Sequence, residues 1–118
     1  EGKGKYSEPK LVWGRTAGLT SLIFLNSDKL GTQYRNDMFV GDVHNGRIYH
    51  FKLNADRTEL VLPDSLESKL ITSLFATGAD KILFGQGFGG ITDLTVGPDG
   101  YLYVVSIGQG KIFRILPK

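Results

Sequence analysis

The sequence predicts an all-β fold made of short antiparallel strands joined by tight turns. Runs rich in β-branched and aromatic residues recur along the chain, and clusters of Gly, Pro and Asp separate them. The clearest example is residues 88–115, where the runs 91–96, 101–105 and 111–116 are joined by Gly97-Pro98-Asp99-Gly100 and by a second loop with two glycines. Pro presets φ and Gly accepts a positive φ, so we expect these runs to form a meander.

Composition places the chain among ordinary globular domains. Its 118 residues suit one domain, and 41% of them are hydrophobic, which is enough for a core. The formal charge of +2 is small and dispersed, so we expect no nucleic-acid partner. No apolar run approaches the roughly 20 residues that span a bilayer, so we expect no membrane partner. Cysteine is absent from the sequence, which excludes disulfides and thiolate metal sites.

The beginning of the chain is polar. It starts at Glu1 and not at Met, so we expect it to be processed or excised from a longer product, and a signal peptide could have been removed. Residues 1–8 are rich in Gly and Lys and are expected to form a flexible lead-in. The remaining expected strands are residues 10–13, 18–25, 37–42, 47–53 and 81–84.

An internal repeat is the strongest organisational signal. Chance likeness between two β-meanders is the competing interpretation, because strands share residue types. Colinear blocks with matching glycines favour a repeat over that interpretation. The four blocks pair Lys10–Arg15 with Lys81–Gln86, Gly18–Phe24 with Gly90–Val96, Met38–Val40 with Leu102–Val104, and Gly46–Phe51 with Gly110–Ile115.

Four short antiparallel strands make one blade of a β-propeller, so we expect residues 9–118 to form a two-blade unit. Repeat 1 covers about residues 10–53 and repeat 2 about residues 81–116, with an insertion at 54–80. The first blade would take residues 81–84 as its outer strand. The second blade would lack an outer strand, while residues 10–13 would be left over.

Two blades cannot close a ring, since propellers have about 4–8 blades. Either the missing blades of a parent chain complete the ring, or copies of this chain assemble head to tail. In the second case three copies would give six blades, and residues 10–13 of one copy would complete the last blade of its neighbour.

The insertion carries the one helical pattern of the sequence. Pro63-Asp64-Ser65 is typical of a helix start, and Leu66, Leu70 and Leu74 recur at a helical spacing. This spacing predicts a short helix near residues 66–74.

The blocks also resemble a known family. Trp13, Thr20–Leu25, Asn36–Asp42, Asn45–Leu53 and Thr92–Tyr103 resemble the C-terminal blades of the soluble glucose/sorbosone dehydrogenases, and the likeness extends from residue 9 to residue 117. These are six-bladed propellers that carry pyrroloquinoline quinone (PQQ) and calcium. The resemblance implies oxidation of a sugar, with hydride passing to the quinone and a His as base, in a protein that is exported to the periplasm or the medium.

The resemblance also implies where a site would lie. It places Trp13 beside the quinone, His44 in a turn that contacts the cofactor, and Arg15 nearby as a third cofactor-binding candidate. Asp93 is the candidate calcium ligand, since carboxylates suit calcium. The loops expected to form the site are residues 15–18, 43–46, 86–90 and 107–110.

No catalytic residue is expected in this chain. Residues 86–90 correspond to the loop that holds the family's catalytic His, and they contain none. Gly90 and Thr92 stand where the family has two cofactor-binding arginines ahead of Asp93.

Each candidate also has a structural interpretation, and the usual behaviour of its residue type favours that interpretation. His44 would be an exposed turn residue, Trp13 would pack at a blade interface, and Asp93 would bond neighbouring backbone. His50 shares a strand face with Ile48, which indicates a structural role.

Two functional hypotheses remain. The first is a segment or small relative of a PQQ-dependent sugar dehydrogenase, incomplete or inactive as a lone chain. The alternative is a non-catalytic two-blade module that self-assembles into a propeller scaffold and binds carbohydrate or protein.

Overall fold

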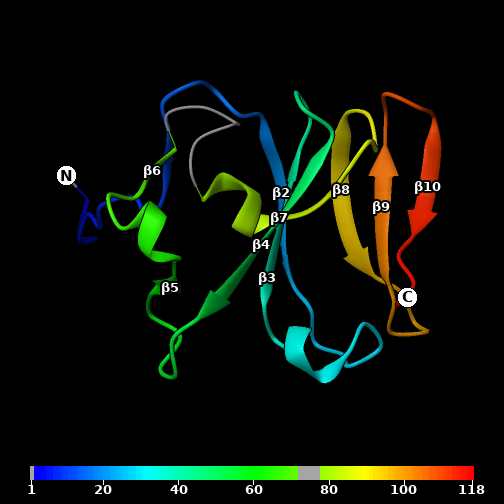
Figure 1. The fold of residues 1–118 in the computed structure, drawn as a ribbon, viewed down its shortest axis with the longest axis horizontal. Coiled ribbons are helices and arrows are strands. Elements are labelled where there is room, and N and C mark those ends of the chain that lie inside the picture. The colour runs from blue at the N-terminus through cyan, green and yellow to red at the C-terminus, as the bar shows by residue number, and fades with distance from the viewer. Residues whose placement is uncertain (1, 72–77) are drawn as a thin grey trace.

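The computed structural model describes residues 2–71 and 78–118, and in them the chain is mostly β (Figure 1). No helix of the described residues is long and apolar enough to cross a membrane. The elements are β1 (Val12–Trp13), β2 (Leu19–Phe24), η1 (Thr32–Tyr34), β3 (Met38–Asp42), β4 (Arg47–Leu53), β5 (Leu60–Val61), η2 (Asp64–Leu66), β6 (Leu70–Ile71), η3 (Ala79–Ile82), β7 (Leu83–Gln86), β8 (Ile91–Val96), β9 (Leu102–Ser106) and β10 (Lys111–Arg114), where η is a 3₁₀ helix.

The first sheet has the antiparallel order β2-β3-β4-β7, with β5 paired to the far end of β4. The prediction that the strand at the start of repeat 2 supplies the fourth strand of the first blade is therefore confirmed. Its predicted start was wrong, because β7 begins at Leu83 and not at Lys81. Gly78 adopts a left-handed conformation, and its carbonyl accepts a hydrogen bond from the Lys81 amide, so residues 79–82 form a 3₁₀ turn instead.

The second sheet is the antiparallel meander β8-β9-β10, as the sequence predicts. β9 lies in its centre, and β8 lies beside the first sheet. Among the described residues, no strand pairs with the outer edge of β10. Antiparallel sheets of this kind are consistent with the predicted propeller blades.

Both sheets contain the same irregularity at the same place in the repeat. The register of β2 against β3 shifts between Leu19 and Ser21, and that of β8 against β9 shifts between Ile91 and Asp93. One extra residue thus lies in each innermost strand, as in a β-bulge. A chance likeness between two meanders would not reproduce such a detail.

The turns that follow also match. The amide of Val43 donates to the carbonyl of Gly18, and the amide of Ile107 donates to that of Gly90, both at 2.8 Å. A glycine with φ of 61° ends each turn, at position 46 and at position 110. Matching bulges and turns support the repeat in three dimensions.

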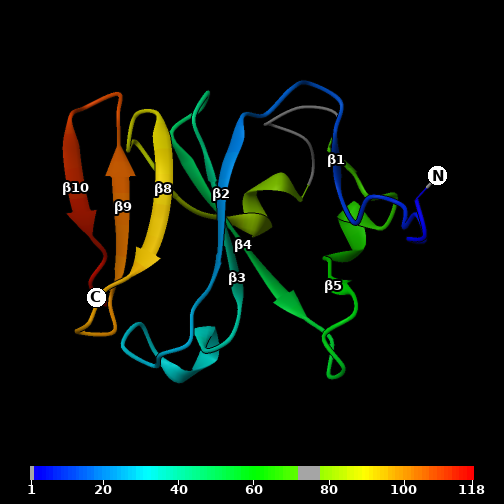
Figure 2. The same cartoon turned by 180° about the vertical axis from the view of Figure 1, so that it is seen from behind.

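Side chains of both sheets form the main core. The two sheets lie side by side in Figures 1 and 2. One face of the first sheet contributes Phe39 and Ile48, and the facing side of the second contributes Leu102 and Val104, all fully buried. β2 and β8 lie next to each other, and Thr20 Oγ1 donates to the carbonyl oxygen of Ile91 at 2.6 Å. The two sheets therefore pack face to face like neighbouring blades.

A second core covers part of the other face of the first sheet. It joins Val40, Tyr49 and Phe51 of that sheet to Leu66 and Ile71 of the insertion. The predicted helix near 66–74 was wrong for the part that the structure describes, because η2 ends at Leu66 and Leu70 lies in β6. Leu74 lies outside the described residues. Leu66 is instead buried at the end of this 3₁₀ turn.

The N-terminal strand is not unpaired, which corrects the expectation for residues 10–13. β1 runs parallel to β6, with Val12 opposite Leu70 and Trp13 opposite Ile71. The amides of Val12 and Gly14 donate to the insertion, each at 2.8 Å. The insertion thus pairs with one edge of this strand, a contact that the sequence did not indicate.

The face-to-face core predicts a large effect of truncating its central aromatic residue. Phe39→Ala should lower the free energy of unfolding in urea by about 3–5 kcal/mol, since it removes a fully buried ring. Phe24→Ala is the matched control, because Phe24 is 43% exposed on the neighbouring strand. Equal losses for the two variants would contradict the packing described here.

Candidate functional site

Four connections meet at one end of the two sheets, at the top of Figure 1. They are the loops that the resemblance implies for a site, and hydrogen bonds join them. The Phe88 amide donates to the Gly46 carbonyl at 3.2 Å, and Gln109 Nε2 donates to the Gly87 carbonyl at 2.8 Å. The bond from Val43 to Gly18 adds the loop that enters β2. The loops therefore form one surface.

Asp42 organises the first half of this surface. Its side chain is fully buried at the end of β3. Oδ1 accepts hydrogen bonds from the amides of Gly18 at 3.1 Å, His44 at 2.9 Å and Asn45 at 3.2 Å. Oδ2 accepts from Asn45 Nδ2 at 2.6 Å and from the Tyr49 hydroxyl at 3.0 Å. Five donors converge on one carboxylate and join the loop entering β2 to the turn between β3 and β4.

These donors decide the charge of Asp42. Burial alone would raise the pKa of this carboxyl, but the hydrogen bonds from Asn45, Tyr49 and His44 outweigh burial and hold the pKa below its ordinary value. The phenol of Tyr49 responds in the opposite direction. Burial and the adjacent Asp42 carboxylate raise the pKa of Tyr49 to about 12, so the phenol stays protonated and keeps donating.

Ser106 occupies the same place in the second half of the surface, at the end of β9. Its hydroxyl donates to the Phe88 carbonyl and accepts from the Gln109 amide at 3.1 Å. The second turn is therefore held by a neutral group where the first uses a buried anion. The sequence analysis missed both residues, although Asp and Ser are favoured at the first position of such turns.

His44 and Arg15 are exposed on this surface. The His44 ring lies against Gly18, since a Cβ at that glycine would come within 3.0 Å of His44 Cγ. Arg15 belongs to the loop that leads from β1 to Gly18. Arg15 and His44 thus lie on adjoining connections, and the backbone of His44 is fixed by its bond to Asp42.

Trp13 lies on the first sheet. Its ring is half-buried and packs on Tyr49, with the ring centroids 5.4 Å apart and the planes tilted by 51°. The indole Nε1 is buried without a hydrogen-bond partner among the described residues. The sequence-based alternative to stacking on a quinone was packing at a blade interface. The ring instead packs within the second core, on the face of the first sheet away from the second sheet.

Asp93 is exposed in the bulge of β8. Calcium requires six to eight oxygen ligands, and the described residues contain no group of three His, Cys, Asp or Glu side chains placed to hold a metal. The described residues therefore do not fit a calcium site. With Trp13 turned onto Tyr49, they do not form a complete PQQ site either.

His50 lies away from the turn surface. Its Nε2 is 2.8 Å from Asp37 Oδ2, and Lys52 Nζ donates to the same oxygen at 2.9 Å. The His50 ring also packs among Tyr34, Phe39 and Phe84. These contacts agree with the structural role that the sequence indicates.

The buried carboxylate gives a pH-dependent prediction. The pKa of Asp42 in the folded chain lies below 3.8, so its contribution to stability is present above that pH and is lost as the pH falls through the folded value. Asp42→Asn should lower the free energy of unfolding at pH 7 by about 1.5–3 kcal/mol, and the difference from wild type should shrink below about pH 4. Urea unfolding followed at several pH values measures both.

Asp64→Asn is the matched control for this measurement, since Asp64 is exposed in η2. That variant should show no comparable loss of stability at pH 7, because it changes an exposed surface side chain. A pH-independent loss for Asp42→Asn would mean that the carboxylate charge plays no part.

Comparison with known proteins supports a distant relationship. No protein-family model matches the chain. No solved structure matches it with significance. Among curated proteins, it is similar to the aldose sugar dehydrogenase YliI of Escherichia coli (strain K12), with 25% identity over 112 residues that cover 94% of this chain and 25% of that protein. The chain thus spans about a quarter of the length of the curated relative it matches, and its resemblance to an aldose sugar dehydrogenase is partial.

Proposed function

We propose that this chain supplies two blades of a propeller of the PQQ-dependent sugar dehydrogenase type, and that it does not oxidise sugars alone. The observation that carries the proposal is the similarity to an aldose sugar dehydrogenase along 94% of the chain. The repeated bulges and turns support it, because they are details expected of neighbouring blades.

The turn surface supports a role at the rim of a sugar-oxidising site. Arg15 and His44 are exposed on adjoining loops. The charged guanidinium of Arg15 suits an anionic quinone, and the imidazole of His44 can form a hydrogen bond to it. PQQ, when bound in a complete propeller, would accept the hydride of the sugar. In this chain, Asp42 would hold the turn of His44 in place, and further blades would supply the remaining groups.

The described residues argue against turnover by the chain alone. Removing the hydroxyl proton of a sugar needs a base positioned at the reacting atoms. His50 is engaged by Asp37 among aromatic rings, and residues 86–90 contain no His. His44 is exposed on a turn, without a neighbouring group of metal ligands among the described residues.

The alternative function, a non-catalytic scaffold, is favoured by one further feature. A groove of about 720 Å³ on the first sheet is lined mainly by apolar side chains. Such a lining suits a protein surface better than a hydroxyl-rich sugar. A scaffold of this kind and a dehydrogenase remnant share the same fold and differ in whether the completed ring has activity. Export from the cytoplasm is part of the proposal and rests on the family resemblance.

A complementation experiment tests the function. The E. coli relative, with the quarter that matches this chain removed, would be co-purified with the 118-residue chain, and reduction of a dye would be followed with an aldose, PQQ and calcium. We expect neither part alone to reduce the dye and the mixture to regain activity. Arg15→Ala and His44→Ala chains should restore less activity than wild type, whereas Lys118→Ala should restore as much.

Two results would contradict the proposal. Dye reduction by the 118-residue chain alone, dependent on PQQ and aldose, would show that the chain is catalytically complete. A mixture that forms a stable complex without activity would favour the scaffold.

A further inference from the structure

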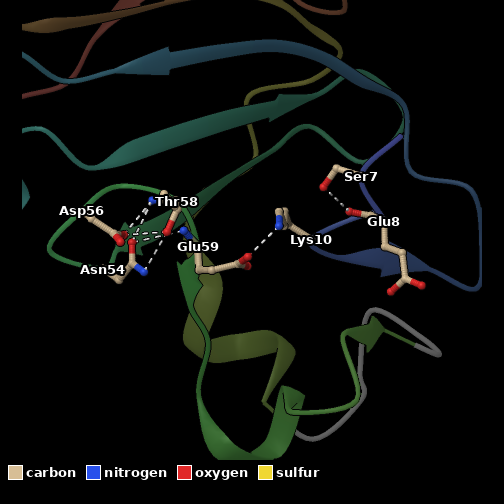
Figure 3. A network of polar contacts seen from close by, with 7 residues as sticks. All are labelled: Ser7, Glu8, Lys10, Asn54, Asp56, Thr58 and Glu59. Atoms are coloured by element: carbon tan, nitrogen blue, oxygen red, sulfur yellow. Dashed lines mark hydrogen bonds and ion pairs between the residues drawn. The ribbon is translucent and has the colours of Figure 1, made fainter. Parts of the chain in front are cut away.

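An apolar groove lies on the face of the first sheet that points away from the second sheet. It runs between β1 and β2, whose positions can be followed in Figure 2. Lys10 and Glu59 form an ion pair of 2.7 Å at its rim, beside a turn that Asn54 holds by accepting the amides of Thr58 and Glu59 (Figure 3). The apolar lining includes Leu11, Trp13, Leu22, Met38, Val40 and Phe51.

The repeat shows what covers this kind of face. Leu22, Met38 and Val40 correspond in the repeat to Leu94, Leu102 and Val104. The three residues of the second sheet are at most 4% exposed, because the first sheet packs on them. In the first sheet, Leu22 is 55% exposed and all three line the groove. The same face is thus covered by a blade in one repeat and only partly covered, by the insertion and Trp13, in the other.

The chain also carries the face that would cover the groove. The first sheet packs on the second through Phe39 and Ile48. Their counterparts in the second sheet are Tyr103, which is half-buried, and Ile112, which is 70% exposed. Each chain therefore has one incompletely covered face of each kind, at opposite ends of its pair of sheets.

The innermost strands show the same asymmetry in a hydrogen bond. Thr20 Oγ1 lies 3.5 Å from the Gly41 carbonyl oxygen and donates across the blades to the Ile91 carbonyl oxygen at 2.6 Å. Thr92, its counterpart, keeps the equivalent of the first contact, at 3.4 Å from the Val105 carbonyl oxygen. It makes no cross-blade bond in the described chain. By the repeat, its missing acceptor is the carbonyl of Leu19.

The internal repeat also predicts a partner strand for the outer edge of β10. In the first sheet, the equivalent strand β4 pairs with β7, with Arg47 opposite Gln86. The counterpart of β7 is β1, so β10 would pair with a β1 strand and place Lys111 opposite Arg15. β1 uses its Val12 and Gly14 amides toward β6. Successive amides of a strand point to opposite sides, so the other edge of β1 faces away from β6.

We propose that the groove receives the second sheet of another copy of this chain. Tyr103 and Ile112 of one copy enter the groove of the next, Thr92 of the first bonds to Leu19 of the second, and β10 pairs with β1. Each contact repeats one that already joins the two sheets within a chain. Such a head-to-tail contact closes as a ring, and three copies give the six blades of the family that the chain resembles. The contact rests on the repeat and not on sugar oxidation.

The predicted register contains one unfavourable pair. Arg15 and Lys111 would lie directly opposite each other, where the first sheet has Arg47 opposite Gln86. Like charges opposite each other weaken a strand pair, and opposite charges strengthen it. Lys111→Glu should therefore tighten the assembly several-fold, and Lys118→Glu, with the same charge change outside the contact, should tighten it much less. A variant that gains assembly cannot be explained by a failure to fold.

Mass and cross-linking test the contact directly. Light scattering should give a trimer of about 39 kDa from chains of 13.0 kDa. The chain has no cysteine, so Arg15→Cys combined with Lys111→Cys introduces a unique pair that the register places within disulfide range. Oxidation should link different chains in this variant. The control pair Val61→Cys with Lys111→Cys should give little linkage.

A substitution in the groove supplies the loss-of-assembly test. Leu22→Arg should give a folded monomer, because Leu22 is already 55% exposed within a single chain. Val61→Arg changes a residue of equal exposure outside the groove lining and should leave the trimer intact. A wild-type chain that is a folded monomer at high concentration would overturn the proposal, as would an oligomer that Leu22→Arg leaves unchanged. Linkage of 15 to 111 in an open, growing chain would support the contact and overturn ring closure.

Discussion

The structure depends on one constraint. The first sheet has apolar side chains on both faces, and both faces must be buried. Phe39 and Ile48 project from one side of the first sheet, and Val40 and Tyr49 project from the other. The second sheet covers the first set completely. The insertion, together with Trp13, covers only the outer part of the other side, which leaves Leu22 half exposed beside the groove. Each blade therefore needs a neighbour on both of its faces. Within this chain, the second sheet covers one face of the first sheet, and the insertion covers part of the other face.

At the turn surface, the two repeats share their backbone geometry but differ in the side chains that hold the turns. The two turns share their bulges, their glycines and their bonds to the entering loop, yet Asp42 holds one and Ser106 the other. The hydrogen bonds from Asn45, Tyr49 and His44 keep Asp42 ionised, and the bond from the His44 amide fixes the backbone of that residue. Ser106 holds the second turn without a charge. The repeat thus preserves the shape of the surface and varies its charge. The turn that carries His44 and adjoins the loop of Arg15 is the one held by a buried anion.

Much of this fold could be predicted, because strand periodicity and turn residues are local signals. The meander of residues 88–115 and the pairing of β7 with β4 follow from runs, glycines and the repeat. The insertion could not be predicted in this way. Leu66 and Leu70 have helical spacing, but burial of Leu66 under the sheet and pairing of β6 with β1 decide their structure. The contacts of Trp13 could not be predicted for the same reason. Trp13 packs on Tyr49, which is distant from it in sequence and which also donates a hydrogen bond to Asp42.

A blade that covered the groove would also complete the turn surface. Within the chain, the turn after β3 reaches the next blade, where Val43 lies close to Gly90. Ile107 is the counterpart of Val43 and is 70% exposed, and Gly18 is the counterpart of Gly90. A blade seated in the groove would therefore place a turn like that of Ile107 beside Gly18 and the His44 ring. A blade that filled the groove would also border Arg15 and His44, so the chemistry available at these two side chains would depend on that neighbour.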